Sequence, residues 1–147
     1  MGASWHDNNA LQVYLQQSPV KEHVHLTGYV ADELKPEAFK SASLYVFPSV
    51  YEGFGLSVAE AMHYGCPVCC SNNSALGEVG KGAALQFSPY DIDAIRDSMQ
   101  RVLENRDGIR ESLISAGFAK VGKFSWDIHA SAIVRLYEEA IAEEAKP

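Results

Sequence analysis

The stretch LYVFPSVYEGFGLSVAEAMHYGCPVCC, residues 44–70, contains a complete strand, helix and strand pattern. Leu44–Phe47 is a continuous apolar run, which is typical of a strand buried on both faces. Ser57–Tyr64 has helical spacing and stops at Gly65, and Pro67–Cys70 is the next apolar run. Two strands joined by a helix predict a right-handed crossover between parallel neighbours.

The alternation of strands and helices continues outside this stretch. Periodicity and capping residues predict helices over Asn8–Gln17, Pro36–Ala42, Ala75–Gly80, Ile92–Asn105, Asp107–Ala119 and Trp126–Ala145, and strands over Val24–Val30 and Ala84–Phe87. Short strands separated by helices predict an α/β domain with a Rossmann-like parallel sheet and helices on both faces. On the last helix we expect a core stripe made of Trp126, Ile133, Leu136 and Tyr137.

Length and composition are those of one globular domain. The chain has 147 residues, of which 47% are hydrophobic and 21% are charged, and this is enough to build a core. Its net charge of -7 argues against binding to nucleic acid, or to an anionic membrane, over the whole domain. The sequence has no apolar run of membrane-spanning length and no signal peptide, so we expect a cytoplasmic protein.

Several side chains have spacings that mimic functional sites. Cys66, Cys69 and Cys70 lie too close together for a disulfide framework, and a redox C-x-x-C would begin a helix, whereas here a strand follows. We therefore expect reduced, buried thiols. We interpret the remaining candidates as structural residues without a metal or catalytic role, namely His23, His25, His63 and Glu78.

A glycine-containing turn, Gly53-Phe54-Gly55, lies between the first strand of the stretch and its helix. Ligands of Rossmann-like sheets bind beyond the carboxyl ends of the strands, where this turn is expected to lie. Glycine lets the backbone approach a ligand closely. The free amides of Leu56, Ser57 and Val58, together with the helix dipole, would form an anion site. We therefore expect a phosphate at this helix start.

Two glutamates, Glu52 and Glu60, flank the start of this helix with seven residues between them. Beside a phosphate, two carboxylates repel the ligand unless neutral donors approach them. A carboxylate accepts hydrogen bonds from two adjacent hydroxyls, and such charge-assisted bonds are stronger than neutral ones. The pattern therefore predicts a ligand with hydroxyl groups on both sides of its phosphates, as in a nucleotide-sugar.

The E-x7-E pattern of Glu52 and Glu60, set in FPSVYEGFGLSVAEAMHYGCPVCCSN, resembles the GT-B family of retaining glycosyltransferases of the family-4 type. Further segments follow in the family's order, namely VHLTGYV, SASLYVFPS, ALGEVG, AALQFSP and FSWDIHASAIVRLYEEAI. The resemblance covers the chain from about Val24 onward, and this order makes the motif far more specific than E-x7-E alone.

The resemblance implies a role for each residue of the motif. Glu52 would contact hydroxyls of the transferred sugar, beside the amides of Gly53–Gly55. The amides of Leu56 and Ser57 would hold the distal phosphate, and Glu60 would accept hydrogen bonds from the ribose. The resemblance also implies retention of the anomeric configuration. It implies no metal or other cofactor, because amides and basic side chains stabilise the leaving diphosphate.

The sequence departs from the family at its beginning. Family members carry an N-terminal acceptor domain. Their C-terminal domain opens with a strand and with an Arg and Lys pair that binds the diphosphate. We find neither feature in residues 1–147. Met1–Asp7 leads at once into a helical stretch, as in a sequence that begins partway through a longer protein. We therefore expect residues 1–147 to be one N-terminally truncated nucleotide-sugar binding domain, which alone binds nucleotide weakly and transfers nothing.

The resemblance leaves the acceptor and the class of function open. Acceptors in the family are often lipid-linked or bacterial surface polysaccharides, which would bring the full-length enzyme to the periphery of a membrane. A non-catalytic nucleotide or nucleotide-sugar binding module would keep the same loop. A hydrolase with Glu52 and Glu60 as paired carboxyl groups would need them about 5 to 9.5 Å apart. The intervening loop and helix turn disfavour that arrangement.

Overall fold

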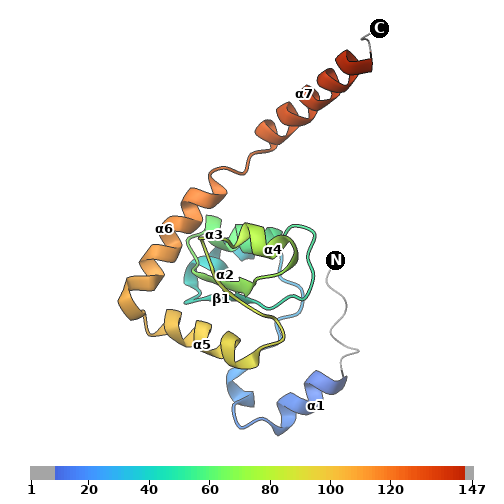
Figure 1. Cartoon of the computed structure of the whole chain (residues 1–147). Helices are drawn as coiled ribbons and strands as arrows, with labels where there is room; N and C mark the ends of the chain where they lie inside the picture. Colours follow the sequence, from blue (N-terminus) through green and yellow to red (C-terminus); the bar gives the residue numbers. More distant parts are fainter. Residues whose placement is uncertain (1–8, 145–147) are drawn as a thin grey trace. The chain divides into compact units, whose positions relative to one another are not determined.

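The structure, a computed structural model, describes residues 9–144 and divides the chain into two compact units between residues 38 and 39 (Figure 1). The first unit contains helix α1 (Asn9–Gln17), two 3₁₀ turns (Lys21–His23 and Asp32–Leu34) and the start of helix α2 (Lys35–Ser41). The predicted first helix is confirmed from Asn9 onward, and Asn8 lies outside the described residues.

The strand predicted over Val24–Val30 does not form within the described chain. Val24 is extended, with φ of -110° and ψ of 118°, and Gly28 has a φ of 65°. The described residues supply no strand that pairs with this segment. The prediction is wrong because alternating side chains indicate only an extended backbone, whereas a strand also needs a neighbour for its N–H and C=O groups.

The second unit is built on a three-stranded parallel sheet with the order β1-β2-β3 (Figure 1). Its strands are β1 (Tyr45–Phe47), β2 (Val68–Ser71) and β3 (Leu85–Phe87). The register places Val46 opposite Cys69 and Cys70 opposite Gln86. All three strands lie where the apolar runs of the sequence predict them, and the central strand β2 is buried at every position.

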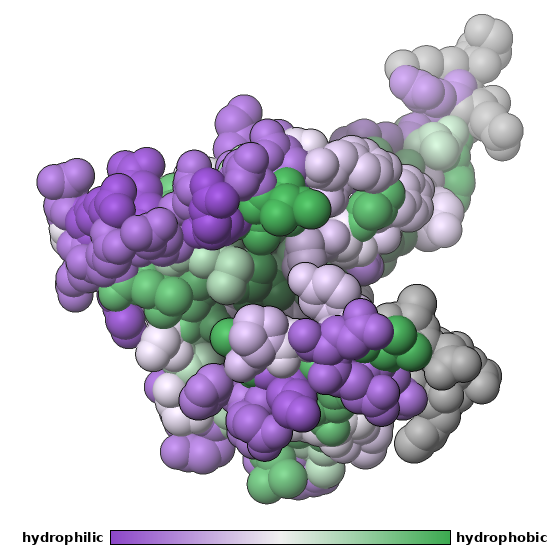
Figure 2. Space-filling model, turned by 90° about the horizontal axis from the view of Figure 1, so that it is seen from below, coloured by the Kyte–Doolittle hydropathy of each residue, from purple (hydrophilic) through white to green (hydrophobic). Residues whose placement is uncertain are grey.

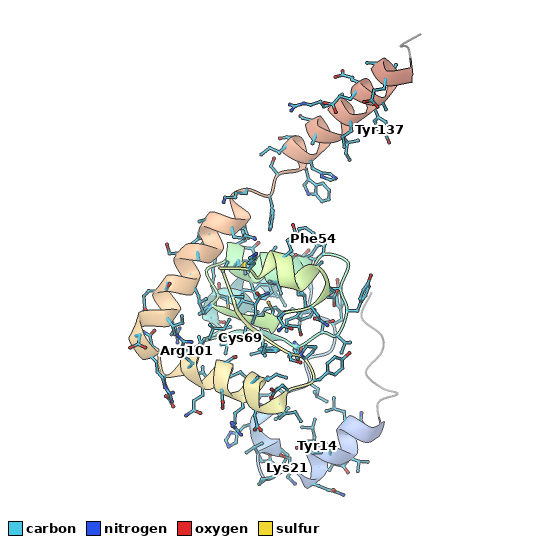
Figure 3. All side chains as sticks on the ribbon, in the orientation of Figure 1. Tyr14, Lys21, Phe54, Cys69, Arg101 and Tyr137 are labelled. Atoms are coloured by element: carbon cyan, nitrogen blue, oxygen red, sulfur yellow. The ribbon has the colours of Figure 1, made fainter. Side chains whose placement is uncertain are left out.

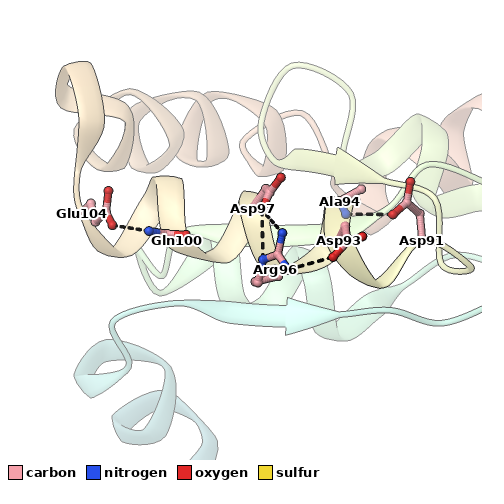
Figure 4. A network of polar contacts seen from close by, with 7 residues as sticks. All are labelled: Asp91, Asp93, Ala94, Arg96, Asp97, Gln100 and Glu104. Atoms are coloured by element: carbon pink, nitrogen blue, oxygen red, sulfur yellow. Dashed lines mark hydrogen bonds and ion pairs between the residues drawn. The ribbon is translucent and has the colours of Figure 1, made fainter.

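The helices of this unit also lie close to their predicted positions. They are α3 (Leu56–His63), α4 (Ser74–Val79), α5 (Ile92–Leu103), α6 (Ile109–Val121) and α7 (Trp126–Glu144), with a 3₁₀ turn at Arg106–Gly108. The carboxylate of Asp91 caps α5 by accepting a hydrogen bond from the Ala94 amide at 2.9 Å. Arg96 bonds to Asp93 and Asp97 on the exposed side of the same helix (Figure 4).

Two clusters of buried side chains cover the sheet. One contains Val58 and Met62 of α3 and Leu76 of α4, and the other contains Val102 of α5 and Leu113 of α6. Val68 and Cys70 of β2 belong to the first cluster, whereas Cys69 belongs to the second. Since successive residues of a strand point to opposite faces, helices cover both faces of the sheet. The predicted Rossmann-like α/β fold is confirmed.

The three cysteines are free thiols in the core, as the sequence predicts. Cys69 and Cys70 are fully buried on opposite faces of β2, and Cys66 is 2% exposed. Burial raises the pKa of Cys66, that of Cys69 to about 12 and that of Cys70 to about 11. Buried, protonated thiols act as small apolar side chains and not as redox groups.

We expect Cys69 and Cys70 to resist alkylation while the chain is folded. The thiolate is the reactive form, and almost none forms at pH 8 when burial holds the pKa values at about 12 and about 11. Iodoacetamide labelling read by mass spectrometry should modify these residues only after guanidinium unfolds the chain. Equal labelling rates in folded and unfolded chain would contradict the burial of β2.

The raised pKa values also predict lower stability in alkaline solution. In the unfolded chain a thiol ionises near its ordinary pKa of 9.0, whereas the folded chain keeps both thiols protonated. Their contribution to stability is therefore fully present below pH 9.0 and is lost as the pH rises toward the folded-state values.

The core stripe predicted on the last helix is wrong for the described structure. Trp126 is 83% exposed, Tyr137 is 68% exposed, and Leu136 and Ile133 are also open to solvent. Figure 3 shows the Tyr137 side chain on α7, and the face of the molecule seen in Figure 2 also has hydrophobic surface between hydrophilic side chains. The apolar spacing is present, but no described element covers this helix face.

Candidate functional site

Loops at the carboxyl ends of the three strands are tied to one another. Residues 48–55 follow β1, residues 72–73 follow β2 and residues 88–91 follow β3. The Asn72 amide donates to the Phe87 carbonyl at 2.9 Å, and the Asn73 side-chain amide donates to the Val50 carbonyl. The carboxyl ends of parallel strands meet at one edge, where open α/β sheets bind ligands. All the candidate residues from the motif lie in the first loop or on α3.

Gly55 has the backbone conformation that begins α3. Its φ of 91° and ψ of 48° lie in the left-handed region, which side chains disfavour. A Cβ atom at this position would lie 2.5 Å from Cδ2 of the buried Leu76. Gly53 differs, since a Cβ there would meet nothing within 4 Å. The fold therefore requires Gly55, whereas Gly53 leaves open space beside the loop.

The first turn of α3 presents two free backbone donors. The amides of Leu56 and Ser57 have no hydrogen-bond acceptor among the described residues. The Val58 amide, which the sequence analysis also expected to be free, donates to the Gly55 carbonyl at 3.0 Å. That part of the prediction is wrong because the helix opens with a 3₁₀-type bond. The remaining two amides point from a helix N-terminus, where an anion is favoured.

Glu52 is held by neighbours at both its side chain and its backbone. The Ser49 hydroxyl donates to Oε1 of Glu52 at 2.9 Å. The Glu52 amide donates to Oγ of Ser74 at 3.1 Å, and its carbonyl accepts from the Ala75 amide at 3.4 Å. Glu52 itself is half-buried. The loop after β1 is thereby fastened to the first turn of α4.

Tyr45 of β1 interacts with both glutamates of the motif, Glu52 and Glu60. Burial raises the pKa of Tyr45, a hydrogen bond with Ser57 lowers it, and the charges of Glu60 and Glu52 raise it further. Both carboxylates therefore lie near the side chain of Tyr45, at the strand that leads into the motif. Glu52, Ser57 and Glu60 thus all act on the side chain of Tyr45.

Two apolar side chains of the motif lie at the surface. Phe54 is 43% exposed and packs edge-on against Phe124, with 5.5 Å between ring centroids (Figure 3). Leu56 is 63% exposed at the first position of α3. Neither side chain builds the core, so at these two positions the backbone amides are the groups suited to a polar ligand.

Sequence reasoning missed the residues that hold the motif in place, namely Tyr45, Ser49, Asn73 and Ser74. Ser74 has a φ of 48°, unusual for a residue other than glycine. A signal existed in the polar run Ser71–Ser74, which follows the carboxyl end of β2. The run could be placed beside a ligand edge, but its partners depend on which loop lies opposite.

The other candidate residues lie outside this cluster. His23 and His25 are exposed, and His63 is an exposed residue whose ring packs edge-on against Tyr64 at 5.0 Å. Within the described residues, no three His, Cys, Asp or Glu side chains are grouped closely enough to hold a metal ion. Glu78 is exposed.

No helix among the described residues is long and apolar enough to cross a membrane.

Comparison with known proteins gives one consistent family. A family model described as "Glycosyl transferases group 1" matches residues 1–120. The chain is 36% identical over 134 residues to O-antigen chain mannosyltransferase B of Escherichia coli, covering 91% of this chain and 35% of that protein. It is 34% identical over 145 residues to phosphatidyl-myo-inositol mannosyltransferase of Mycobacterium tuberculosis, covering 94% and 38% respectively.

A further relative and a solved structure agree with these matches. MMP alpha-(1->4)-mannosyltransferase of Mycolicibacterium hassiacum is 32% identical over 142 residues, covering 94% of this chain and 34% of that protein. Sucrose-phosphate synthase from Thermosynechococcus elongatus has a similar structure, with a TM-score of 0.77 and 27% identity, covering 90% of this chain and 34% of that one. The chain therefore spans about a third of the length of the relatives it matches.

Proposed function

The chain belongs to the glycosyl transferase group 1 family, and from that premise we propose that it is the donor-binding domain of a retaining, family-4 type glycosyltransferase. The reaction would move a sugar from a nucleotide-sugar to an acceptor hydroxyl. One observation carries the proposal: the free amides of Leu56 and Ser57 begin α3 directly after the loop that holds Glu52, and the charges of Glu52 and Glu60 both act on Tyr45 of β1. Carboxylates and helix amides in this arrangement suit hydroxyls and phosphates respectively.

In this proposal each group contacts a different part of the donor. Glu60 accepts hydrogen bonds from the ribose, and the amides of Leu56 and Ser57 hold the distal phosphate. Glu52 binds hydroxyls of the transferred sugar, beside the backbone of Gly53–Gly55, where the structure leaves open space at Gly53. No metal or other cofactor is included, because amides and basic side chains neutralise the leaving diphosphate.

We propose mannose as the transferred sugar. The three relatives described above, with 32% to 36% identity, are each named as mannosyltransferases. Sucrose-phosphate synthase, the similar solved structure described above, is not named as a mannosyltransferase and is less similar, at 27% identity. A polysaccharide or lipid-linked acceptor is consistent with the names of the first two relatives, which refer to O-antigen chains and to phosphatidyl-myo-inositol.

The acceptor would bind to a domain outside this sequence. The relatives are about three times as long as the segment matched here. The exposed apolar side chains of α7, such as Trp126, Leu136 and Tyr137, offer a surface that a further domain would cover. The cytoplasmic location and the peripheral attachment of the whole enzyme to a membrane stay predictions.

The proposed function is tested by two-dimensional amide NMR titration with UDP, GDP, ADP and CDP. We expect one of them to shift the amide signals of residues 53–58, and we expect Glu60→Ala to weaken that binding by about 10-fold or more, because a hydrogen bond to a charged group contributes about 1.5 to 3 kcal/mol. Binding that maps elsewhere on the chain, or that Glu60→Ala leaves unchanged, would contradict the proposal.

A further inference from the structure

The carboxylate of Glu52 is bonded on one oxygen only. Ser49 donates its hydroxyl hydrogen to Oε1 at 2.9 Å, and no described residue donates to Oε2. Ser49 lies in the loop two residues after the end of β1, and its hydroxyl also lies 3.3 Å from the Tyr51 carbonyl, so the nearer acceptor is the Glu52 carboxylate. The bond therefore orients the flexible Glu52 side chain and leaves its other carboxylate oxygen free to accept hydrogen bonds.

The loop after β2 and the first turn of α4 hold the backbone around Glu52. Oγ of Ser74 accepts from the Glu52 amide at 3.1 Å, the Ala75 amide donates to the Glu52 carbonyl at 3.4 Å, and Asn73 holds the Val50 carbonyl. Ser74 adopts a left-handed φ of 48°, a conformation that costs free energy for a residue with a side chain. Ser74, the residue with this strained backbone, is also the one whose hydroxyl accepts the hydrogen bond from the Glu52 amide.

We propose that Ser49 is a positioning residue for sugar recognition, which rests on the proposed function of this site. By donating to Oε1 it leaves Oε2 of Glu52 available for a sugar hydroxyl, next to Gly53, where a Cβ would meet nothing within 4 Å. The Ser49 hydroxyl has its hydrogen-bond acceptors in Glu52 and the Tyr51 carbonyl, and it bonds neither to the free amides of α3 nor to Glu60. It therefore acts on the sugar part of the donor and not on the nucleotide part.

This division of roles gives a specific binding pattern. Ser49→Ala should weaken a nucleotide-sugar by about 3- to 10-fold, which is the usual effect of one lost hydrogen bond, and should leave the free nucleoside diphosphate unchanged. The probes are GDP-mannose beside GDP and UDP-glucose beside UDP, titrated on the complete 147-residue chain by amide NMR. Ser49→Thr keeps the hydroxyl and should restore binding. Ser112→Ala, at an exposed serine on α6, is the matched control.

A second measurement needs no ligand. Carbon relaxation of the Glu52 methylene groups reports how well the side chain is ordered, and we expect motion to increase in Ser49→Ala and to return to its original level in Ser49→Thr. Equal loss of affinity for GDP and GDP-mannose, or unchanged Glu52 order in Ser49→Ala, would overturn the inference. If the unaltered chain binds no probe, the proposed function fails, and the relaxation data alone decide whether Ser49 orders Glu52.

Discussion

Gly55→Ala is expected to destabilise the second unit by about 2 to 6 kcal/mol, through two independent effects. The first is backbone strain, because a φ of 91° in a residue with a Cβ costs about 1 to 3 kcal/mol. The second is overpacking, because the new Cβ would lie 2.5 Å from Cδ2 of Leu76. Leu76 is fully buried in the core, so its terminal methyl can move only by repacking neighbouring side chains, and such overpacking costs about 1 to 3 kcal/mol.

The measurement is urea unfolding followed by far-ultraviolet circular dichroism, with Gly53→Ala as the matched control. Gly53 lies two positions earlier in the same turn, its φ is outside the left-handed region, and a Cβ there would contact nothing within 4 Å. Its substitution should change the free energy of unfolding by about 0.5 kcal/mol or less. If both variants unfolded at the same urea concentration, the geometry described for Gly55 would be incorrect.

The effect of Gly55 reaches the candidate site as well as the fold. Gly55 is the residue before the first turn of α3, and its carbonyl accepts from the Val58 amide at 3.0 Å. Its left-handed backbone therefore sets the direction of the Leu56 and Ser57 amides. A variant that kept its fold by shifting this turn would lose the anion site, so nucleotide binding should fall together with stability.

The sheet could be predicted from the sequence because its strands are short apolar runs between glycines and prolines. Leu44–Phe47, Pro67–Cys70 and Ala84–Phe87 predict β1, β2 and β3 within two residues at each end. These strands are central or covered on both faces, so nearly every position is apolar, with Ser71 and Gln86 as the exceptions. Parallel pairing follows because helices intervene between them.

Two other predictions failed because they depend on parts that the local sequence does not contain. Val24–Val30 alternates as a strand does, but pairing requires a neighbouring strand that the described chain lacks. The stripe on α7 has core spacing, yet Trp126 and Tyr137 are exposed. Periodicity shows which face of an element is apolar, whereas burial depends on a partner surface.

Only part of the candidate site could be predicted from local sequence patterns. Glu52, Glu60 and Gly55 could be found because the motif, its spacing and the glycine conformation are local. The hydrogen bonds that Glu52 makes with Ser49 and Ser74 could not be found in this way. The bond between Glu52 and Ser74 joins residues 22 positions apart. Such contacts depend on how two loops meet at the sheet edge, and the register of β1 and β2 decides this.

Glu52→Gln is expected to lower sugar transfer by roughly 10- to 150-fold, since one hydrogen bond to a charged group contributes about 1.5 to 3 kcal/mol. The glutamine keeps the size of the side chain and can still accept from Ser49, but it lacks the negative charge that strengthens bonds to sugar hydroxyls. The 147-residue chain alone should transfer nothing, because the acceptor is proposed to bind elsewhere.

The assay therefore uses a chimera in which this chain replaces the matching segment of O-antigen chain mannosyltransferase B, to which it is 36% identical. Mannosyl transfer by the unaltered chimera is compared with that of Glu52→Gln and of Glu78→Gln. Glu78 is an exposed carboxylate whose backbone carbonyl, not its side chain, accepts from Lys120 at 2.9 Å, so its substitution should leave the rate unchanged. Equal rates for all three proteins would remove Glu52 from the reaction. Transfer by the 147-residue chain itself would instead show that it carries its own acceptor site.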